Sequence, residues 1–94
     1  MVRIIDNRCT GKTSRLMLLA KEHNALFVCA RPNHMQEKAE AYGIQGIHFV
    51  SYEDFLRLNY DTDEQTVVVD ELDELLKRMV YPLSLLGYSI SIED

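Results

Sequence analysis

The sequence predicts an α/β fold, a three-layer sandwich in which helices flank a five-stranded, mainly parallel sheet. Strand-like and helix-like runs alternate along the whole chain, as they do in strand–helix–strand units. The strand-like run at 25–30 is apolar throughout, which is typical of strands covered on both faces. With 94 residues, the chain is expected to form a single domain spanning residues 1–94.

Five strands and four helices are expected. The strands are residues 2–5, 25–30, 47–50, 66–70 and 88–92. The helices are residues 12–23, 32–42, 52–58 and 72–79. Three consecutive valines make 66–70 the most strand-like run, whereas the leucines of 72–79 repeat at the spacing of an amphipathic helix.

Charge and composition limit the classes of partner and location. Ten basic and fifteen acidic residues give a net charge of −5, which disfavours nucleic-acid binding driven by overall charge. No apolar run approaches the roughly 18 residues of a membrane span, and the chain opens on a strand-like run, so neither membrane association nor a signal peptide is expected. Two cysteines without zinc-type spacing indicate a reducing, cytoplasmic location.

A candidate phosphate-binding loop lies between the first predicted strand and the first predicted helix. Residues 6–13 read DNRCTGKT and match G-x-x-x-x-G-K-[ST] except at the first position, where Asp6 replaces glycine. A loop entering a helix N-terminus presents free N–H groups and the positive end of the helix dipole to an anion. Gly11 lets the backbone approach phosphates, Lys12 supplies positive charge to the β- and γ-phosphates, and Thr13 offers a hydroxyl to magnesium.

The whole loop is expected to contact the nucleotide. Its contact residues are Asn7, Arg8, Cys9, Thr10, Gly11, Lys12, Thr13 and Ser14. Asp6 places a carboxylate beside a triphosphate, which is repulsive unless it points away or a neighbouring arginine neutralises it. The alternative is that Gly-Lys-Thr only caps a helix.

A second motif follows the valine-rich strand. Asp70 at the strand's carboxyl end is a candidate magnesium ligand, because magnesium prefers oxygen donors and keeps several waters. Glu71 is placed to orient or deprotonate an attacking water. Lys12 and Glu71 are therefore the candidate catalytic residues, and Thr13 and Asp70 the candidate metal ligands. Taken alone, two acids before a helix are more simply explained as complementing its dipole.

Together the motifs resemble the Walker A and Walker B elements of P-loop NTPases, and the adjacent glutamate resembles the RecA-like and helicase-type branch. The overall pattern is also similar to small P-loop proteins of bacteriophages, which would place the chain in host cytoplasm. The resemblance implies a minimal P-loop core that binds ATP and Mg²⁺. It also implies a strand between the two motif strands, here 88–92, with a polar sensor at Ser89, Ser91 or Glu93.

Three functions are weighed. The leading expectation is nucleoside-triphosphate binding, with ATP as the expected nucleotide and weak or partner-dependent hydrolysis, in replication, recombination or packaging of nucleic acid. The second, motivated by Asp6, is a degenerate P-loop protein that regulates or inhibits a partner ATPase. The third is a small nucleic-acid-binding module that uses Arg31. The predicted strand 2–5 is expected near a sheet edge, through which a protein partner or a second copy would pair.

The remaining candidates receive structural interpretations. Cys29 is expected in the core, and Tyr52 and Tyr60 are interpreted as packing residues. Arg57 and Arg78 are interpreted as surface residues rather than arginine fingers for a neighbouring subunit.

Overall fold

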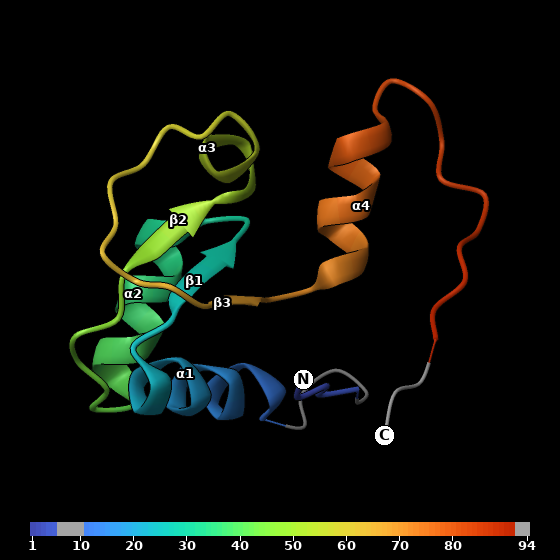
Figure 1. The fold of residues 1–94 in the computed structure, drawn as a ribbon. Helices are drawn as coiled ribbons and strands as arrows, with labels where there is room; N and C mark the ends of the chain where they lie inside the picture. The colour runs from blue at the N-terminus through green and yellow to red at the C-terminus, as the bar shows by residue number, and fades with distance from the viewer. Residues whose placement is uncertain (6–10, 92–94) are drawn as a thin grey trace.

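The computed structural model describes residues 1–5 and 11–91, which form an α/β fold with a three-stranded parallel sheet flanked by helices (Figure 1). The elements follow the chain as α1 (Lys12–His23), β1 (Leu26–Cys29), α2 (Pro32–Ala41), β2 (Phe49–Ser51), α3 (Tyr52–Leu56), β3 (Val67–Val69) and α4 (Leu72–Val80). This order and these types agree with the expectation for the central part of the chain. The helix predicted at 12–23 is confirmed with the same bounds.

The sheet has the order β2-β1-β3, so β1 is its central strand. Both pairings are parallel, with Phe27 opposite Phe49 on one side and opposite Val68 on the other. All four β1 residues are buried. The continuously apolar sequence of this strand therefore reflects cover on both faces, as the sequence predicts.

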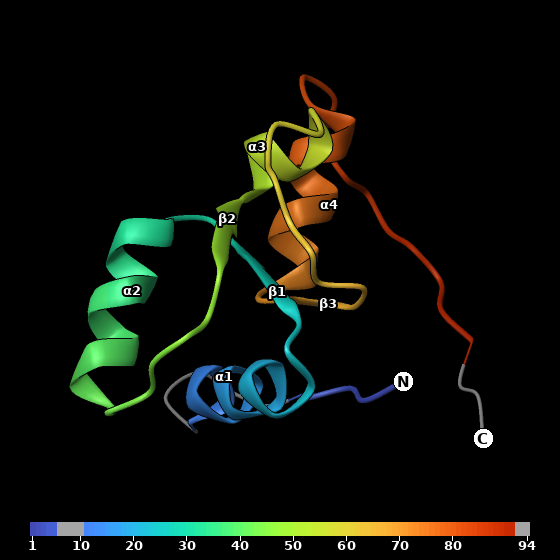
Figure 2. The same cartoon turned by 60° about the vertical axis from the view of Figure 1, so that its left-hand side comes forward.

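The two faces of β1 build two separate cores. Phe27 and Cys29 pack with residues of α1 and α2, including Met17 and Met35. Leu26 and Val28 point to the opposite face, where they meet Val50, Tyr52 and Leu75. Figure 2 shows α2 on one side of the sheet and α3 with α4 on the other. The protein is thus a three-layer arrangement, because successive side chains of a strand point to opposite faces.

Local signals fix the ends of several helices. The Ser51 hydroxyl accepts a hydrogen bond of 3.1 Å from the Asp54 N–H and so caps α3. Gly11 precedes α1 with a left-handed φ of 79°, a conformation that glycine adopts without steric cost. α4 ends at Val80, and Tyr81, the residue after it, precedes Pro82, which disfavours helical backbone in the residue before it.

The prediction of five strands is wrong. Residues 2–5 and the described part of 88–92, residues 88–91, contain no strand, and Ile92 lies outside the described residues. The side chains of Val2, Ile5, Tyr88 and Ile90 are more than half exposed. Apolar composition alone does not make a strand, because a strand is held by hydrogen bonds to a neighbouring strand.

The two terminal segments instead contact each other. The Arg3 guanidinium donates a 3.0 Å hydrogen bond to the carbonyl oxygen of Ser91. Figures 1 and 2 both show residues 83–91 running outside α4, away from the sheet. Within the described residues, β2 and β3 are therefore the sheet edges, and the expected edge position of residues 2–5 is wrong.

The predicted sensor residues therefore do not lie on a strand of the sheet within the described residues. Ser89 and Ser91 are exposed on a segment outside the sheet, and Glu93 lies outside the described residues. The described helices are all too short or too polar to cross a lipid bilayer.

Candidate functional site

The start of α1 and the turn after β3 come together at one side of the molecule. The Lys12 Nζ atom lies 3.0 Å from Oε1 of Glu71. The Thr13 side chain lies close enough to the Asp70 carboxyl to lower its pKa. The two motifs are far apart in the sequence, and the structure brings these four of their residues into contact. The remaining contact residues predicted in the loop, Asn7, Arg8, Cys9 and Thr10, lie outside the described residues, as does Asp6.

The first turn of α1 is organised around Gly11. Its carbonyl oxygen accepts hydrogen bonds from the Arg15 N–H at 3.1 Å and from the Ser14 hydroxyl at 2.9 Å. Ser14, predicted to contact the nucleotide, therefore uses its hydroxyl on the backbone of its own turn. Lys12 and Thr13, between these residues, are half-buried and point toward the end of β3.

Asp70 is the one buried charged residue of the described chain, at 9% exposure. Its N–H donates to the Val28 carbonyl at 2.9 Å, so β1 fixes its backbone. Burial raises the pKa of the Asp70 carboxyl and the charge of Glu71 adds to the rise, whereas Lys12 and the Thr13 side chain oppose it. A buried carboxylate beside a second acid is stabilised by a nearby cation.

Glu71 has an unusual backbone conformation. It precedes α4 with φ 54° and ψ 66°, in the left-handed region that non-glycine residues rarely adopt. Its side chain is 39% exposed and forms the ion pair with Lys12, whose side chain is 22% exposed. Strained residues of this kind persist where surrounding contacts hold them, and they are frequent at functional sites.

Tyr52 contacts this turn, which the sequence interpretation missed. Its hydroxyl lies 2.5 Å from the carbonyl oxygen of Asp70 and 3.2 Å from that of Glu71. A tyrosine hydroxyl is protonated at neutral pH and can donate to these carbonyls. Burial, together with the charge of Asp70, raises the pKa of the Tyr52 hydroxyl further. A signal was present in the sequence: Tyr52 lies two residues after the end of the predicted strand 47–50, and the carboxyl ends of parallel strands meet at one edge of the sheet.

The described donors fit a magnesium ion accompanied by a triphosphate. The Asp70 carboxylate and the Thr13 hydroxyl are oxygen donors of the kind magnesium prefers, and Lys12 supplies a charge for phosphate. Residues 1–5 and 11–91 contain no group of three or more His, Cys, Asp or Glu residues suited to a metal. A metal at Asp70 would therefore complete its coordination mainly with water and phosphate oxygens, which is usual for magnesium.

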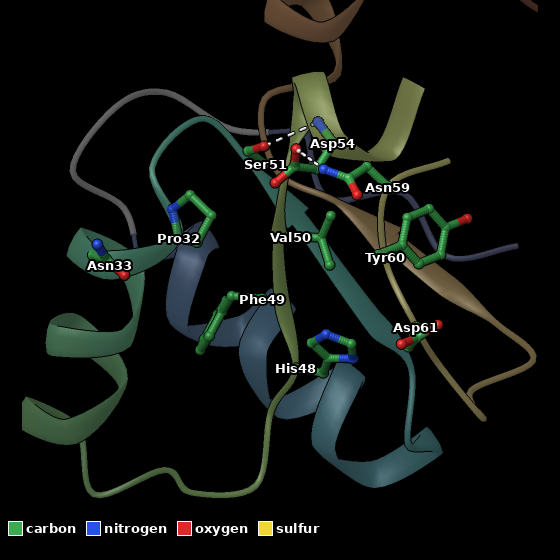
Figure 3. A pocket seen from close by; sticks show the side chains of 10 residues that line it. All are labelled: Pro32, Asn33, His48, Phe49, Val50, Ser51, Asp54, Asn59, Tyr60 and Asp61. Atoms are coloured by element: carbon green, nitrogen blue, oxygen red, sulfur yellow. Dashed lines mark hydrogen bonds between the residues drawn. The ribbon is translucent and has the colours of Figure 1, made fainter. Parts of the chain in front are cut away.

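A separate cavity of about 420 Å³ opens beside β2, the opposite edge strand (Figure 3). It is lined by Pro32, Asn33, His48, Phe49, Val50, Ser51, Asp54, Asn59, Tyr60 and Asp61. Asp54 accepts a 3.2 Å hydrogen bond from the Asn59 amide, drawn as a dashed line in the figure. None of the four motif residues lines this cavity, so it is distinct from the candidate phosphate site.

Two of the predicted surface residues also have defined positions. Arg78 pairs with Glu53, and its guanidinium carbon lies 5.4 Å from the centre of the Tyr52 ring. Arg57 is exposed directly after α3. Cys29 is fully buried in the core, as predicted.

Comparison with known proteins gives no match: no family model fits the chain, and neither curated proteins nor solved structures match it significantly.

Proposed function

We propose that this protein is a minimal P-loop NTPase domain that binds ATP with Mg²⁺ and hydrolyses it weakly or with the help of a partner. The observation that carries the proposal is the meeting of Lys12 and Thr13 with Asp70 and Glu71. A helix cap or a pair of dipole-complementing acids would not require the two motifs to contact each other. We propose that the activity acts in nucleic-acid transactions, because the two motifs resemble those of helicase-type ATPases.

Each residue has a defined role in this proposal. Lys12 would contact the β- and γ-phosphates, and the N–H groups at the start of α1 would face the same charge. Thr13 and Asp70 would hold magnesium, which when bound neutralises phosphate charge. Glu71 would orient the attacking water and accept its proton. Because Glu71 pairs with Lys12, phosphate would compete with Glu71 for the Lys12 ammonium.

Weak or assisted turnover follows from the position of the candidate arginines. Arg78 is held by Glu53 and by the face of the Tyr52 ring. Arg57 is exposed directly after the end of α3. An arginine at the γ-phosphate contributes about 10³-fold or more to the rate in related reactions. We therefore expect a partner or a second copy to supply such a group.

The test is a titration of the protein with a fluorescent ATP analogue in the presence of Mg²⁺. Lys12→Ala should weaken binding roughly 10- to 100-fold, because charge-assisted hydrogen bonds contribute about 1.5–3 kcal/mol. Lys77→Ala is the matched control, since Lys77 is an exposed lysine paired with Glu74 on α4. Equal affinities in wild type and Lys12→Ala would contradict the site assignment.

A second candidate is a non-enzymatic regulator of a partner ATPase. It is favoured by the Lys12–Glu71 pair, which occupies the lysine with an internal carboxylate, and by Asp6 in the loop. If this protein is such a regulator, the wild type and the Lys12→Ala variant should change the partner's ATPase rate by the same amount. A loss of that effect in Lys12→Ala would contradict the regulator and favour nucleotide binding at this site.

The third function considered, a nucleic-acid-binding module, would use Arg31, which is exposed at the start of α2. Binding of nucleic acid by such a module should weaken as the salt concentration is raised.

A further inference from the structure

We propose that Tyr52 is the positioning residue of this site, whose hydroxyl holds the left-handed turn at Glu71 and so directs the Glu71 carboxylate to Lys12. The role assigned to the Glu71 carboxylate rests on the proposed function. The contact of the Tyr52 hydroxyl with the carbonyl groups of Asp70 and Glu71, called the clamp below, does not depend on that function. No motif assigns this role to Tyr52, which comes from a different strand–helix unit.

The argument begins with the geometry of the two carbonyl groups. In an extended strand, successive carbonyls point in opposite directions along the hydrogen-bonding plane. The left-handed conformation of Glu71 turns the carbonyls of Asp70 and Glu71 to the same side. Both then lie within hydrogen-bonding distance of one hydroxyl, at 2.5 and 3.2 Å. Because these carbonyls belong to the peptide planes on either side of Glu71, one hydroxyl restrains both its φ and its ψ.

The Tyr52 ring is itself firmly held. Its side chain is 1% exposed and packs in the core with Val28 and Leu75. Its backbone begins α3 directly after Ser51, whose hydroxyl caps the helix. Arg78 lies over the ring face. A hydroxyl on so fixed a ring is suited to set the position of another group, because preorganised sites depend on supports whose own rotamers are locked.

The clamp connects three strands to the site. Tyr52 follows β2, the turn that it contacts follows β3, and the Asp70 N–H bonds to Val28 of β1. The turn is therefore tied to both other strands of the sheet. The Glu71 side chain leaves this restrained backbone and reaches Lys12 at 3.0 Å. Loss of the hydroxyl should free the turn and leave the ring packing intact.

The experiment compares Tyr52→Phe with Tyr60→Phe. Tyr60 is the matched control, since it is a half-buried tyrosine that stacks on Phe55 with ring centres 5.7 Å apart. NMR of the ligand-free protein reads the backbone shifts and the HN–Hα coupling of Glu71. We expect Tyr52→Phe to move both observables away from left-handed values. Tyr60→Phe should change neither.

A second pair of variants separates positioning from simple loss of a hydrogen bond. Glycine adopts the left-handed conformation without help, so Tyr52→Phe should lower the urea midpoint less in a Glu71→Gly background than in wild type. A Tyr52→Phe chain that unfolds while Tyr52→Phe/Glu71→Gly folds would support the same conclusion. Equal losses of midpoint in both backgrounds, or unchanged Glu71 signals in Tyr52→Phe, would overturn the clamp. If wild type binds no nucleotide, the proposed function fails, and the Glu71 signals and midpoints still decide the role of Tyr52.

Discussion

The central strand β1 and the terminal segment 88–91 were both predicted to be strands, and they have opposite environments. The four residues of β1 are at most 3% exposed, whereas Tyr88 and Ile90 are 60% and 61% exposed. β1 pairs with a strand on each side and is covered by helices on both faces. Residues 88–91 contact the N-terminal segment through Arg3 and lie away from the sheet. Paired strands on both sides distinguish β1 from the exposed segment.

The described residues of the candidate site are connected to β1 and its two cores, and not to the exposed segment 88–91. Asp70 is fixed by a hydrogen bond to Val28 of β1, and Tyr52 packs against the same strand. Lys12 and Thr13 begin the helix whose Met17 packs in the core with Phe27. The site should therefore depend on the integrity of β1 and tolerate substitutions in the exposed segment.

The largest expected difference between the two regions is in thiol reactivity. Burial and the charge of Asp70 raise the pKa of the Cys29 thiol from 9.0 to about 12. A pKa raised by about three units lowers the thiolate fraction near pH 8 about a thousandfold, and the thiolate is the reactive form. In a Cys9→Ser chain, Cys29 should react with an aromatic disulfide reagent about a thousandfold more slowly than a thiol introduced by Ser89→Cys.

Unfolding in urea should remove this difference, and the folded Cys29 should gain reactivity only as the pH approaches its raised pKa. Absorbance of the released thiolate gives the rates. Similar rates for the two thiols in the folded chains would mean that β1 is not covered as described.

Stability should follow the same contrast. Phe27 is fully buried and meets the Phe49 ring edge-on, with centres 5.0 Å apart. Phe27→Ala should destabilise the fold by about 3–5 kcal/mol, because it removes apolar contacts and leaves a cavity. Ile90→Ala should change the free energy of unfolding by no more than about 0.5 kcal/mol. Urea unfolding followed by circular dichroism measures both. An Ile90→Ala loss as large as that of Phe27→Ala would place residues 88–91 in the core.

The smallest expected effect is on nucleotide affinity, and it concerns the ion pair between Lys12 and Glu71. Glu71→Gln removes the negative charge that pairs with Lys12 and that lies beside the proposed phosphates. The pair is partly exposed, so its contribution is small, about 0.2–1 kcal/mol. Calorimetry should therefore detect nucleotide binding about two- to fivefold tighter, together with loss of any turnover. Glu74→Gln, which breaks the Lys77 pair on the outer surface of α4, serves as the control. Weaker binding by Glu71→Gln would show that the carboxylate assists binding.

Local patterns predicted most of the fold. The helix at 12–23 was predicted to the residue because glycine and the leucine spacing define it locally. The valine run identified β3 for the same reason. The terminal segments were wrongly predicted as strands because pairing is non-local. A short apolar run does not reveal whether a neighbouring strand lies within reach.

In the candidate site, too, the residues of local motifs were predicted and the contacts between distant segments were not. Lys12, Thr13, Asp70 and Glu71 were identified from motif spacing, and the structure brings them together. The contact of Tyr52 with the Asp70–Glu71 turn depends on the position of β2 beside β1, which no local pattern specifies. The exposed position of Ser89 and Ser91 likewise follows from the sheet, not from their own sequence.

The most direct test of the central claim, a single magnesium–nucleotide site at the end of β3 and the start of α1, is the magnesium dependence of ATP-analogue binding in Asp70→Asn. Asp73→Asn, the same change three residues later in the first turn of α4, is the matched control. We predict that magnesium raises the affinity of wild type and Asp73→Asn and leaves that of Asp70→Asn unchanged. An undiminished magnesium effect in Asp70→Asn would contradict the site.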